Sequence, residues 1–224
     1  MKKTSKFLKS IALFTLLLPN LILAENERIS VGAPPEQVEI LDDFDSEETS
    51  ECLDSTRTGF FHSYPPIYYP ASSHWIMKIS ALGDSLEIEN GAVFEFDPWD
   101  GQKALYWKAQ TPITITQNRT WFSKYSYRII EQSTGESIPA NLKLGPFENS
   151  EYTHFLAIID RNQGAVALTN NLSLSICPDD EKAFATWHEG QAIIIGINSG
   201  WQSKTYNLIL INVNKNNFVR AKQF

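Results

Sequence analysis

The stretch Leu86-Glu-Ile-Glu-Asn-Gly-Ala-Val-Phe-Glu-Phe96 decides the fold class of this protein. Apolar and acidic side chains alternate on both sides of Asn90-Gly91, and a period of two is that of a β-strand with one buried face. Asn-Gly between two such runs is a strong signal for a two-residue hairpin turn, because both residues adopt positive φ readily. The stretch therefore predicts two antiparallel strands joined by a tight turn.

The same pattern returns 80 residues later. Setting residue n against residue n+80 gives 13 identities without a gap between residues 74–129 and 154–209. The first-copy members of these pairs are His74, Ile79, Asn90, Pro98, Asp100, Trp107, Ile113, Ile115, Asn118, Trp121, Ser123, Lys124 and Ile129. Self-similarity at a fixed spacing indicates a repeated structural unit. We therefore expect an all-β protein with two tandem small antiparallel β-barrel or sandwich domains of SH3-like size, with five or six strands each.

Four segments are predicted along the chain: a signal peptide (1–24), an acidic disordered linker (25–58), and two copies of the β domain (59–146 and 147–224). The first copy has a lead-in rich in aromatic residues and proline. Nine acidic residues occur between Glu36 and Asp54. Dense like charge with little apolar surface keeps a chain extended, so we interpret this segment as a solvated spacer, with a site for a basic partner as the alternative.

The N-terminus has the pattern of a secretory signal. Four lysines precede an apolar run from Ile11 to Ala24, which is too short for a spanning helix. Cleavage after Ala24 predicts a periplasmic or secreted protein with no integral membrane span, and a retained anchor is the alternative. Removing four positive charges changes the formal net charge from −7 to −11. An acidic protein is repelled by phosphate backbones, so no nucleic-acid partner is expected.

The two cysteines, Cys52 and Cys177, permit one disulfide in an exported protein. Such a bridge would join the linker to the second copy, and two separate thiols are the alternative. The four histidines show no spacing typical of a metal site, so neither a metal nor a cofactor is expected. His74 and His154 each begin the first strand of a copy, where a structural role is the simpler interpretation.

No nucleophile elbow, phosphate-binding loop or dinucleotide fingerprint occurs in the sequence. Asp100 and Asp180 each follow a proline by two residues, and we interpret them as turn caps. The segments that contain them, 98–107 and 178–187, hold the only helix-like composition and predict one short helical turn each. A catalytic role for these two aspartates would need a second titratable group nearby. No catalytic residue is therefore assigned.

The tryptophans are the candidate binding residues. Trp107 and Trp187 follow the helical turns and are predicted to fill the core. Trp121 and Trp201 lie in the shared loop pattern Trp-x-Ser-Lys with Lys124 and Lys204, where a ring can stack on a sugar or a peptide or can cover the barrel edge. Trp99 occurs only in the first copy and is a candidate for a contact unique to that copy.

One copy resembles a known group of proteins. The run Glu89-Asn-Gly-Ala-Val-Phe-Glu-Phe-Asp-Pro-Trp-Asp100, followed by Trp107, Ile113-Thr-Ile115, Trp121-Phe-Ser-Lys-Tyr125 and Thr134-Gly-Glu-Ser137, resembles an uncharacterised family of small exported proteins of chlamydia-like bacteria. The likeness covers about 70 residues of the first copy. The second copy departs from it at Asn214-Lys-Asn-Asn217 and at Cys177, which replaces Asp97. The resemblance implies an envelope or secreted location and no activity.

These patterns favour a non-catalytic exported protein that binds or scaffolds in the cell envelope. Two linked copies raise avidity for a repeated target, so the expected partner is an envelope polymer or protein. A hydrolase acting on an envelope polymer, with Asp100 or Asp180 in its site, is one alternative. A secreted effector that binds a host partner is another.

Overall fold

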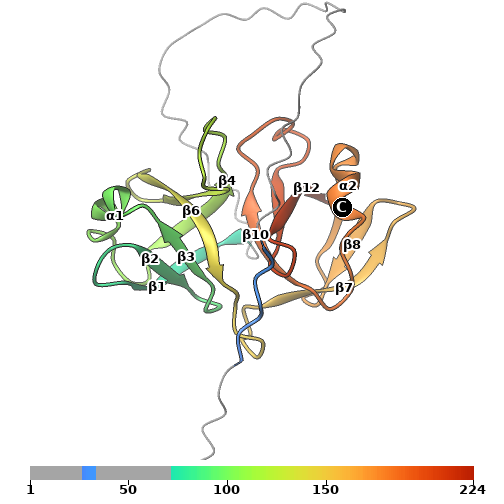
Figure 1. The fold of residues 1–224 in the computed structure, drawn as a ribbon. Coiled ribbons are helices and arrows are strands. Elements are labelled where there is room, and N and C mark those ends of the chain that lie inside the picture. The colour runs from blue at the N-terminus through green and yellow to red at the C-terminus, as the bar shows by residue number, and fades with distance from the viewer. Residues whose placement is uncertain (1–26, 34–71) are drawn as a thin grey trace, which may run out of the picture.

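The computed structural model describes residues 27–33 and 72–224, and in these ranges the protein is an all-β structure (Figure 1). Six strands and one helix form the first half: β1 (His74–Ile79), β2 (Ser85–Ile88), β3 (Val93–Phe96), α1 (Pro98–Ala104), β4 (Pro112–Gln117), β5 (Tyr127–Glu131) and β6 (Ser137–Leu144). The strands pair antiparallel in the order β1-β2-β3-β6-β5-β4, and β1 also pairs with β4. This last pairing closes the six strands into a barrel, here called the first ring.

The second half has the same order of elements: β7 (His154–Asp160), β8 (Ala165–Leu168), β9 (Ser173–Ile176), η2 (Pro178–Asp180) with α2 (Glu181–Phe184), β10 (Ala192–Ile197), β11 (Leu208–Asn212) and β12 (Asn217–Gln223). Strands β8, β9 and β10 begin 80 residues after β2, β3 and β4. Pairing of β10 with β7 closes the second ring. One parallel bridge between Thr116 of β4 and Ile197 of β10 joins the rings in a single twelve-stranded sheet. The division into two separate domains stays a prediction.

The predicted hairpin is present, but its turn is longer than two residues. Leu86 pairs with Phe94 and Glu87 with Val93, as the alternation requires. The strands end at Ile88 and begin again at Val93. The Gly91 N–H donates to the Ile88 carbonyl at 2.8 Å, and Gly91 has a φ of 89°. A turn followed by a left-handed glycine suits the twist of the strands as well as the two-residue turn does.

Both predicted core tryptophans are buried, and each meets a polar partner through its indole N–H. Trp107 Nε1 donates to Glu136 at 3.2 Å, and Trp187 Nε1 donates to Asn217 at 2.9 Å. The predicted helical turns are also present, as α1 and as η2 with α2. The helix α1 precedes Trp107, and η2 with α2 precedes Trp187.

The outer face of the second ring packs against the hydrophobic core of the first ring. In β4 the isoleucines face the first core and threonines alternate with them, whereas β10 is apolar on both faces. Ile193 and Ile195 pack inside the second ring. Ile194 packs with Ile209 and Ile211 of β11 against the core of the first ring. The continuous apolar run at 192–197 therefore results from burial on two sides.

Residues 27–33 cross the joint between the rings, although they belong to the segment predicted to be a disordered linker. The Ile29 N–H donates to Pro146 O at 2.9 Å, and the Gly32 N–H donates to Val213 O at 3.0 Å. The Arg28 guanidinium lies 4.1 Å from the centre of the Phe147 ring. Ile29 and Val31 alternate and pack on the shared core, which explains why this part follows the sheet. The acidic stretch itself lies outside the described residues.

Candidate binding site at the paired hairpin tips

Two hairpin loops leave the sheet side by side and in the same direction (Figure 1). Residues 118–126 connect β4 to β5 and are called the first tip; residues 198–207 connect β10 to β11 and are called the second tip. The Gln117 amide donates to Asn198 Oδ1 and accepts from the Ser199 N–H at 3.3 Å. Arg119 Nη1 donates to Ser199 O at 3.4 Å. The parallel pairing and these bonds hold the tips together.

Two glycines let the second tip approach the first. A Cβ on Gly196 would lie 2.4 Å from the carbonyl oxygen of Ile115, and a Cβ on Gly200 would lie 2.3 Å from Gln117 Nε2. The corresponding positions of the first ring hold Thr116 and Thr120. The close contact between the tips therefore depends on residues in which the two copies differ.

The repeated asparagines shape the two tips from inside. Asn118 Nδ2 donates to Ser123 Oγ at 2.8 Å and to Tyr125 O at 2.9 Å. Asn198 Nδ2 donates to Trp201 O at 3.1 Å and to Tyr206 O at 2.6 Å. These amides satisfy loop carbonyls that no strand partner reaches, so each tip has a defined conformation. Asn118 and Asn198 thus organise the loops instead of facing a partner.

The ends of the tips carry large exposed aromatic side chains. Trp121 is 79% exposed, Phe122 is 96% exposed and Trp201 is 75% exposed. The Trp121 and Phe122 rings meet edge to face, with centres 5.9 Å apart. Phe122 also has a φ of 66°, in the left-handed region where bulky side chains are unfavourable. An aromatic residue at such a position gains no burial from folding.

The sequence segments that form the tips are basic. Residues 101–130 and 190–224 contain no acidic residue, in a chain whose formal net charge is −7. Exposed cations on the tips are Arg119, Lys124 and Lys204. Lys124 Nζ lies 5.1 Å from the centre of the Tyr125 ring. Among the described residues, Asp179 contacts the second tip: it accepts from Gln202 Nε2 at 3.0 Å and lies 3.6 Å from the Arg220 guanidinium.

The structure thus brings four predicted binding residues onto neighbouring loops: Trp121 and Lys124 on the first tip, Trp201 and Lys204 on the second. Trp99 is 88% exposed but lies on α1, at the outer edge of the first ring (Figure 1). Sequence comparison of the copies missed Phe122, because the second copy has Gln202 at that position. The signal that could have found it is an apolar ring directly beside a repeated loop tryptophan.

His74 has a structural role where the first ring of strands meets the second. Its Nδ1 lies 2.6 Å from Glu89 Oε1, and its Nε2 lies 2.8 Å from the carbonyl oxygen of Ile195 in the other ring. Burial lowers the pKa of His74, but the Glu89 carboxylate and the Ile195 carbonyl outweigh burial and leave the pKa raised. Neither imidazole nitrogen of His74 is therefore available to a substrate or a metal.

His154, the counterpart of His74, has a different environment. Its pKa is lowered by burial and by the positive charge of His74. Thr169 stands where the first copy has Glu89, and its hydroxyl accepts from the Phe155 N–H at 3.1 Å. The second copy therefore keeps the backbone contact without the carboxylate.

Neither aspartate caps a turn through its side chain as predicted, although Asp180 occupies the N-cap position of α2. Asp97 is the residue that caps α1, because its carboxylate accepts from the Trp99 N–H at 3.0 Å. Asp100 lies within the first turn and contacts Lys103 Nζ at 3.1 Å. Asp180 makes no side-chain cap; it accepts from Arg220 Nε and Nη2, each at 2.9 Å. Both carboxylates are thus ion-paired.

Cys177 is buried, with its Sγ 3.0 Å from Gln202 Oε1. Burial raises the pKa of the Cys177 thiol. Cys52 lies outside the described residues, so the bridge between the two cysteines stays a prediction.

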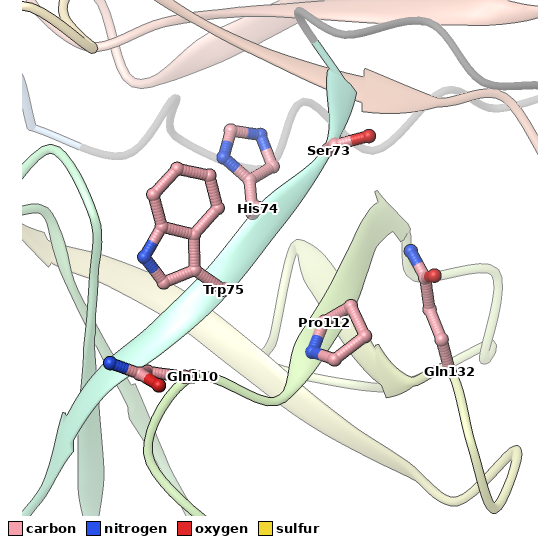
Figure 2. Close-up of a pocket in the computed structure, with 6 residues that line it drawn as sticks. All are labelled: Ser73, His74, Trp75, Gln110, Pro112 and Gln132. Atoms are coloured by element: carbon pink, nitrogen blue, oxygen red, sulfur yellow. The ribbon is translucent and has the colours of Figure 1, made fainter.

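An open depression of about 530 Å³ lies where β1 meets β4 (Figure 2). Its lining residues are Ser73, His74, Trp75, Gln110, Pro112 and Gln132. The titratable side chain among them is His74, which is held by Glu89 and Ile195. In the part of the chain that the structure describes, no three potential ligands are grouped to hold a metal ion.

Comparison with known proteins adds no relative: no family model, curated protein or solved structure matches the chain. Among the helices of residues 27–33 and 72–224, none has the length and apolar character to cross a membrane.

Proposed function

We propose that this protein is a non-catalytic binding protein of the cell envelope and that it contacts its partner through the paired tips. The observation that supports this proposal is the exposure of Trp121, Phe122 and Trp201 on two loops that are held side by side. Defined loops on a rigid scaffold often carry binding residues, and clustered exposed aromatic side chains often mark an interaction site. The lysines of both tips flank this aromatic surface.

The contacts of the candidate acids argue for binding over catalysis. Hydrolysis by paired carboxylates needs one acid that accepts a proton and one that gives it up. Asp100 and Asp180 belong to different rings and pair with Lys103 and Arg220. Each carboxylate is therefore engaged by a cation of its own ring of strands, which suits a structural role better than proton transfer.

Two features of the sequence support the location and the two-tip contact that we propose. The lysines and the apolar run of residues 1–24 support secretion to the periplasm or beyond. The shared residues and the equal spacing of β2, β3 and β4 from their counterparts support a duplicated unit. A duplicated unit presents two related tips to one partner, and the second contact then forms without a new diffusional encounter.

Retention on an isolated envelope fraction tests the proposal. The chain without residues 1–24 contains every residue that the structure describes, and we expect it to be retained. Replacement of Trp121, Phe122 and Trp201 by alanine should abolish retention without altering the circular dichroism spectrum. Tyr106→Ala removes an aromatic ring that is 84% exposed outside the tips and should have no effect. Equal retention of the triple variant would exclude the tips as the contact surface.

A further inference from the structure

The chemistry of the paired tips also points to the class of partner. We infer that the tips bind the surface of an anionic lipid bilayer, with Trp121, Phe122 and Trp201 entering the headgroup region and the nearby cations facing the lipid charges. This inference rests on the proposed function, because it assigns a partner to the same surface.

The first argument is the position of the aromatic side chains. Trp121, Phe122 and Trp201 lie at the ends of hairpins that leave the sheet in the same direction (Figure 1). Loop ends that project together can reach a flat surface at the same time. Tryptophan is enriched at membrane–water interfaces, where an amphipathic ring lies at the level of the headgroups.

The second argument is charge complementarity. Arg119, Lys124 and Lys204 lie on the tips, and the segments 101–130 and 190–224 carry no acidic residue. Lys222 approaches the base of the second tip, with Nζ 5.6 Å from the centre of the Tyr206 ring. A protein that is acidic as a whole therefore presents cations at the end where Trp121, Phe122 and Trp201 are exposed. Basic residues beside a membrane-facing segment are attracted to anionic lipids.

The third argument distinguishes a bilayer from a sugar polymer. Recognition of a sugar needs polar side chains that hydrogen-bond its hydroxyl groups around a stacked ring. On the tips these polar groups are engaged internally: Asn118 binds Ser123 and Tyr125, and Asn198 binds Trp201 and Tyr206. The exposed side chains on the tips are apolar rings and cations together with Thr120 and Thr205, and the rings and cations suit a bilayer surface.

The difference between the tips at one position supports the same partner. Phe122 and Gln202 occupy equivalent positions and share a left-handed φ of 66° and 59°. The Gln202 side chain folds back toward the strands of the second ring, where it contacts Cys177 and Asp179. Phe122 projects into solvent instead. The loop shape thus does not require an aromatic residue at this position, so the phenylalanine is explained by an external apolar contact.

Vesicle sedimentation tests the inference. The probes are vesicles of phosphatidylcholine alone and vesicles in which one third of the lipid is phosphatidylglycerol. The chain without residues 1–24 should sediment with the anionic vesicles and much less with the neutral ones, and added salt should weaken the binding. Trp121→Ala combined with Trp201→Ala should lower the affinity roughly tenfold or more. Phe122→Gln, which copies the second tip, should lower it by a smaller factor.

The matched controls separate the apolar contribution from the ionic one. Lys124→Gln with Lys204→Gln should reduce the preference for anionic vesicles, by roughly fivefold per lysine, and leave neutral vesicles unaffected. Tyr106→Ala, which removes an aromatic ring that is 84% exposed outside the tips, should bind as the parent chain does. Circular dichroism and the melting temperature check that every variant is folded.

The outcomes distinguish this inference from the proposed function. Absence of vesicle binding by the folded parent chain overturns the lipid assignment, as does equal binding by the tip variants. If the parent is still retained on a delipidated envelope fraction and the triple alanine variant is not, the tips bind a polymer or a protein and the proposed function stands. If the triple variant is retained there as well, both proposals fail.

Discussion

His74 and Glu89 form a buried ion pair at the boundary between the two rings, with Nδ1 of the imidazole 2.6 Å from Oε1 of the carboxylate. The two side chains are 5% and 4% exposed. The other imidazole nitrogen faces the carbonyl oxygen of Ile195 in the second ring. Both nitrogens face acceptors, and a doubly protonated imidazole donates to each of them. The raised pKa of His74 favours the imidazolium.

This pair predicts a pH dependence of stability. The folded-state pKa of His74 is raised above 6.5, so its stabilisation is fully present below about pH 6.5 and is lost as the pH rises through the folded-state pKa. The groups that act on it are Glu89, the Ile195 carbonyl and His154. Urea unfolding of the parent chain and of His74→Gln at several pH values measures the difference. A difference that grows with pH would contradict the prediction.

Glu89→Thr introduces the residue that the second ring has at the equivalent position, Thr169. This change should reverse the direction in which the stabilisation by His74 depends on pH. Removing one member of a buried pair costs about 3 to 5 kcal/mol in unfolding free energy. Without the carboxylate, burial lowers the pKa of His74, and the contribution of this residue is then lost as the pH falls. Thr169→Ala, which alters the corresponding position without affecting a charge, is the control. Unchanged pH dependence in Glu89→Thr would show that the pair does not form.

Ile194→Thr tests whether the rings fold as one unit. The variant places on β10 the residue type that β4 has at Thr114, and it removes a side chain that packs on the core of the first ring. We expect a loss of about 2 to 3 kcal/mol in unfolding free energy. Calorimetry of the parent chain should show one cooperative transition. Two separate transitions, with Ile194→Thr affecting the second alone, would mean that the rings fold independently.

Gly196→Ala tests the close approach of β10 to β4. The added methyl group would meet a backbone carbonyl, that of Ile115, so the strands must separate. We expect a loss of about 1 to 3 kcal/mol in unfolding free energy. At Gly200 the added methyl group meets the end of the Gln117 side chain, which can move, so Gly200→Ala should cost less. Equal stability of Gly196→Ala and the parent would contradict the observed spacing.

Tyr127→Phe tests an unusual feature of the first core. The Tyr127 hydroxyl is buried and has no hydrogen-bond partner among the described residues, and burial raises its pKa. Removing a buried group without a partner should leave the stability unchanged or raise it by about 1 kcal/mol. Chemical denaturation gives the value. A clear loss of stability would indicate that the hydroxyl has a partner in solution.

The predicted signal peptide is tested by mass spectrometry of the exported protein. Cleavage after Ala24 gives a mature chain that begins at Glu25, two residues before the docked segment 27–33. A protein that retains residues 1–24 would instead be held by an anchor. Expression of the chain in a secretion-competent bacterium, with separate analysis of cells and periplasm, distinguishes these outcomes.

The strands of each ring follow from local alternation that the sequence displays openly. Leu86 and Ile88, or Phe94 and Phe96, could be assigned to one buried face without knowing what they pack against. The spacing of 80 residues then carried the assignment to the second half. The tip residues Trp121 and Trp201 were also identified in this way, because both belong to the repeated pattern.

The contacts between the rings could not be predicted in the same way. Ile194 and Ile211 disturb the period of two, but periodicity alone does not say which neighbour buries the second face of a strand. His74 was expected to be structural, yet its partners are Glu89, fifteen residues away, and a carbonyl in the other ring. Phe122 was overlooked because comparison of the two copies draws attention to what they share.

The sequence by itself therefore determined the all-β class, the strand pattern and the residues that each unit needs for its own core. These depend on side-chain alternation and turn chemistry, which act over a few residues. Only the tertiary structure decided that the barrels close, that they pack through β10 and β11, and that the two tips lie side by side. Such contacts join residues about 80 positions apart, such as Gln117 and Asn198, and are selected by packing and hydrogen bonding in space.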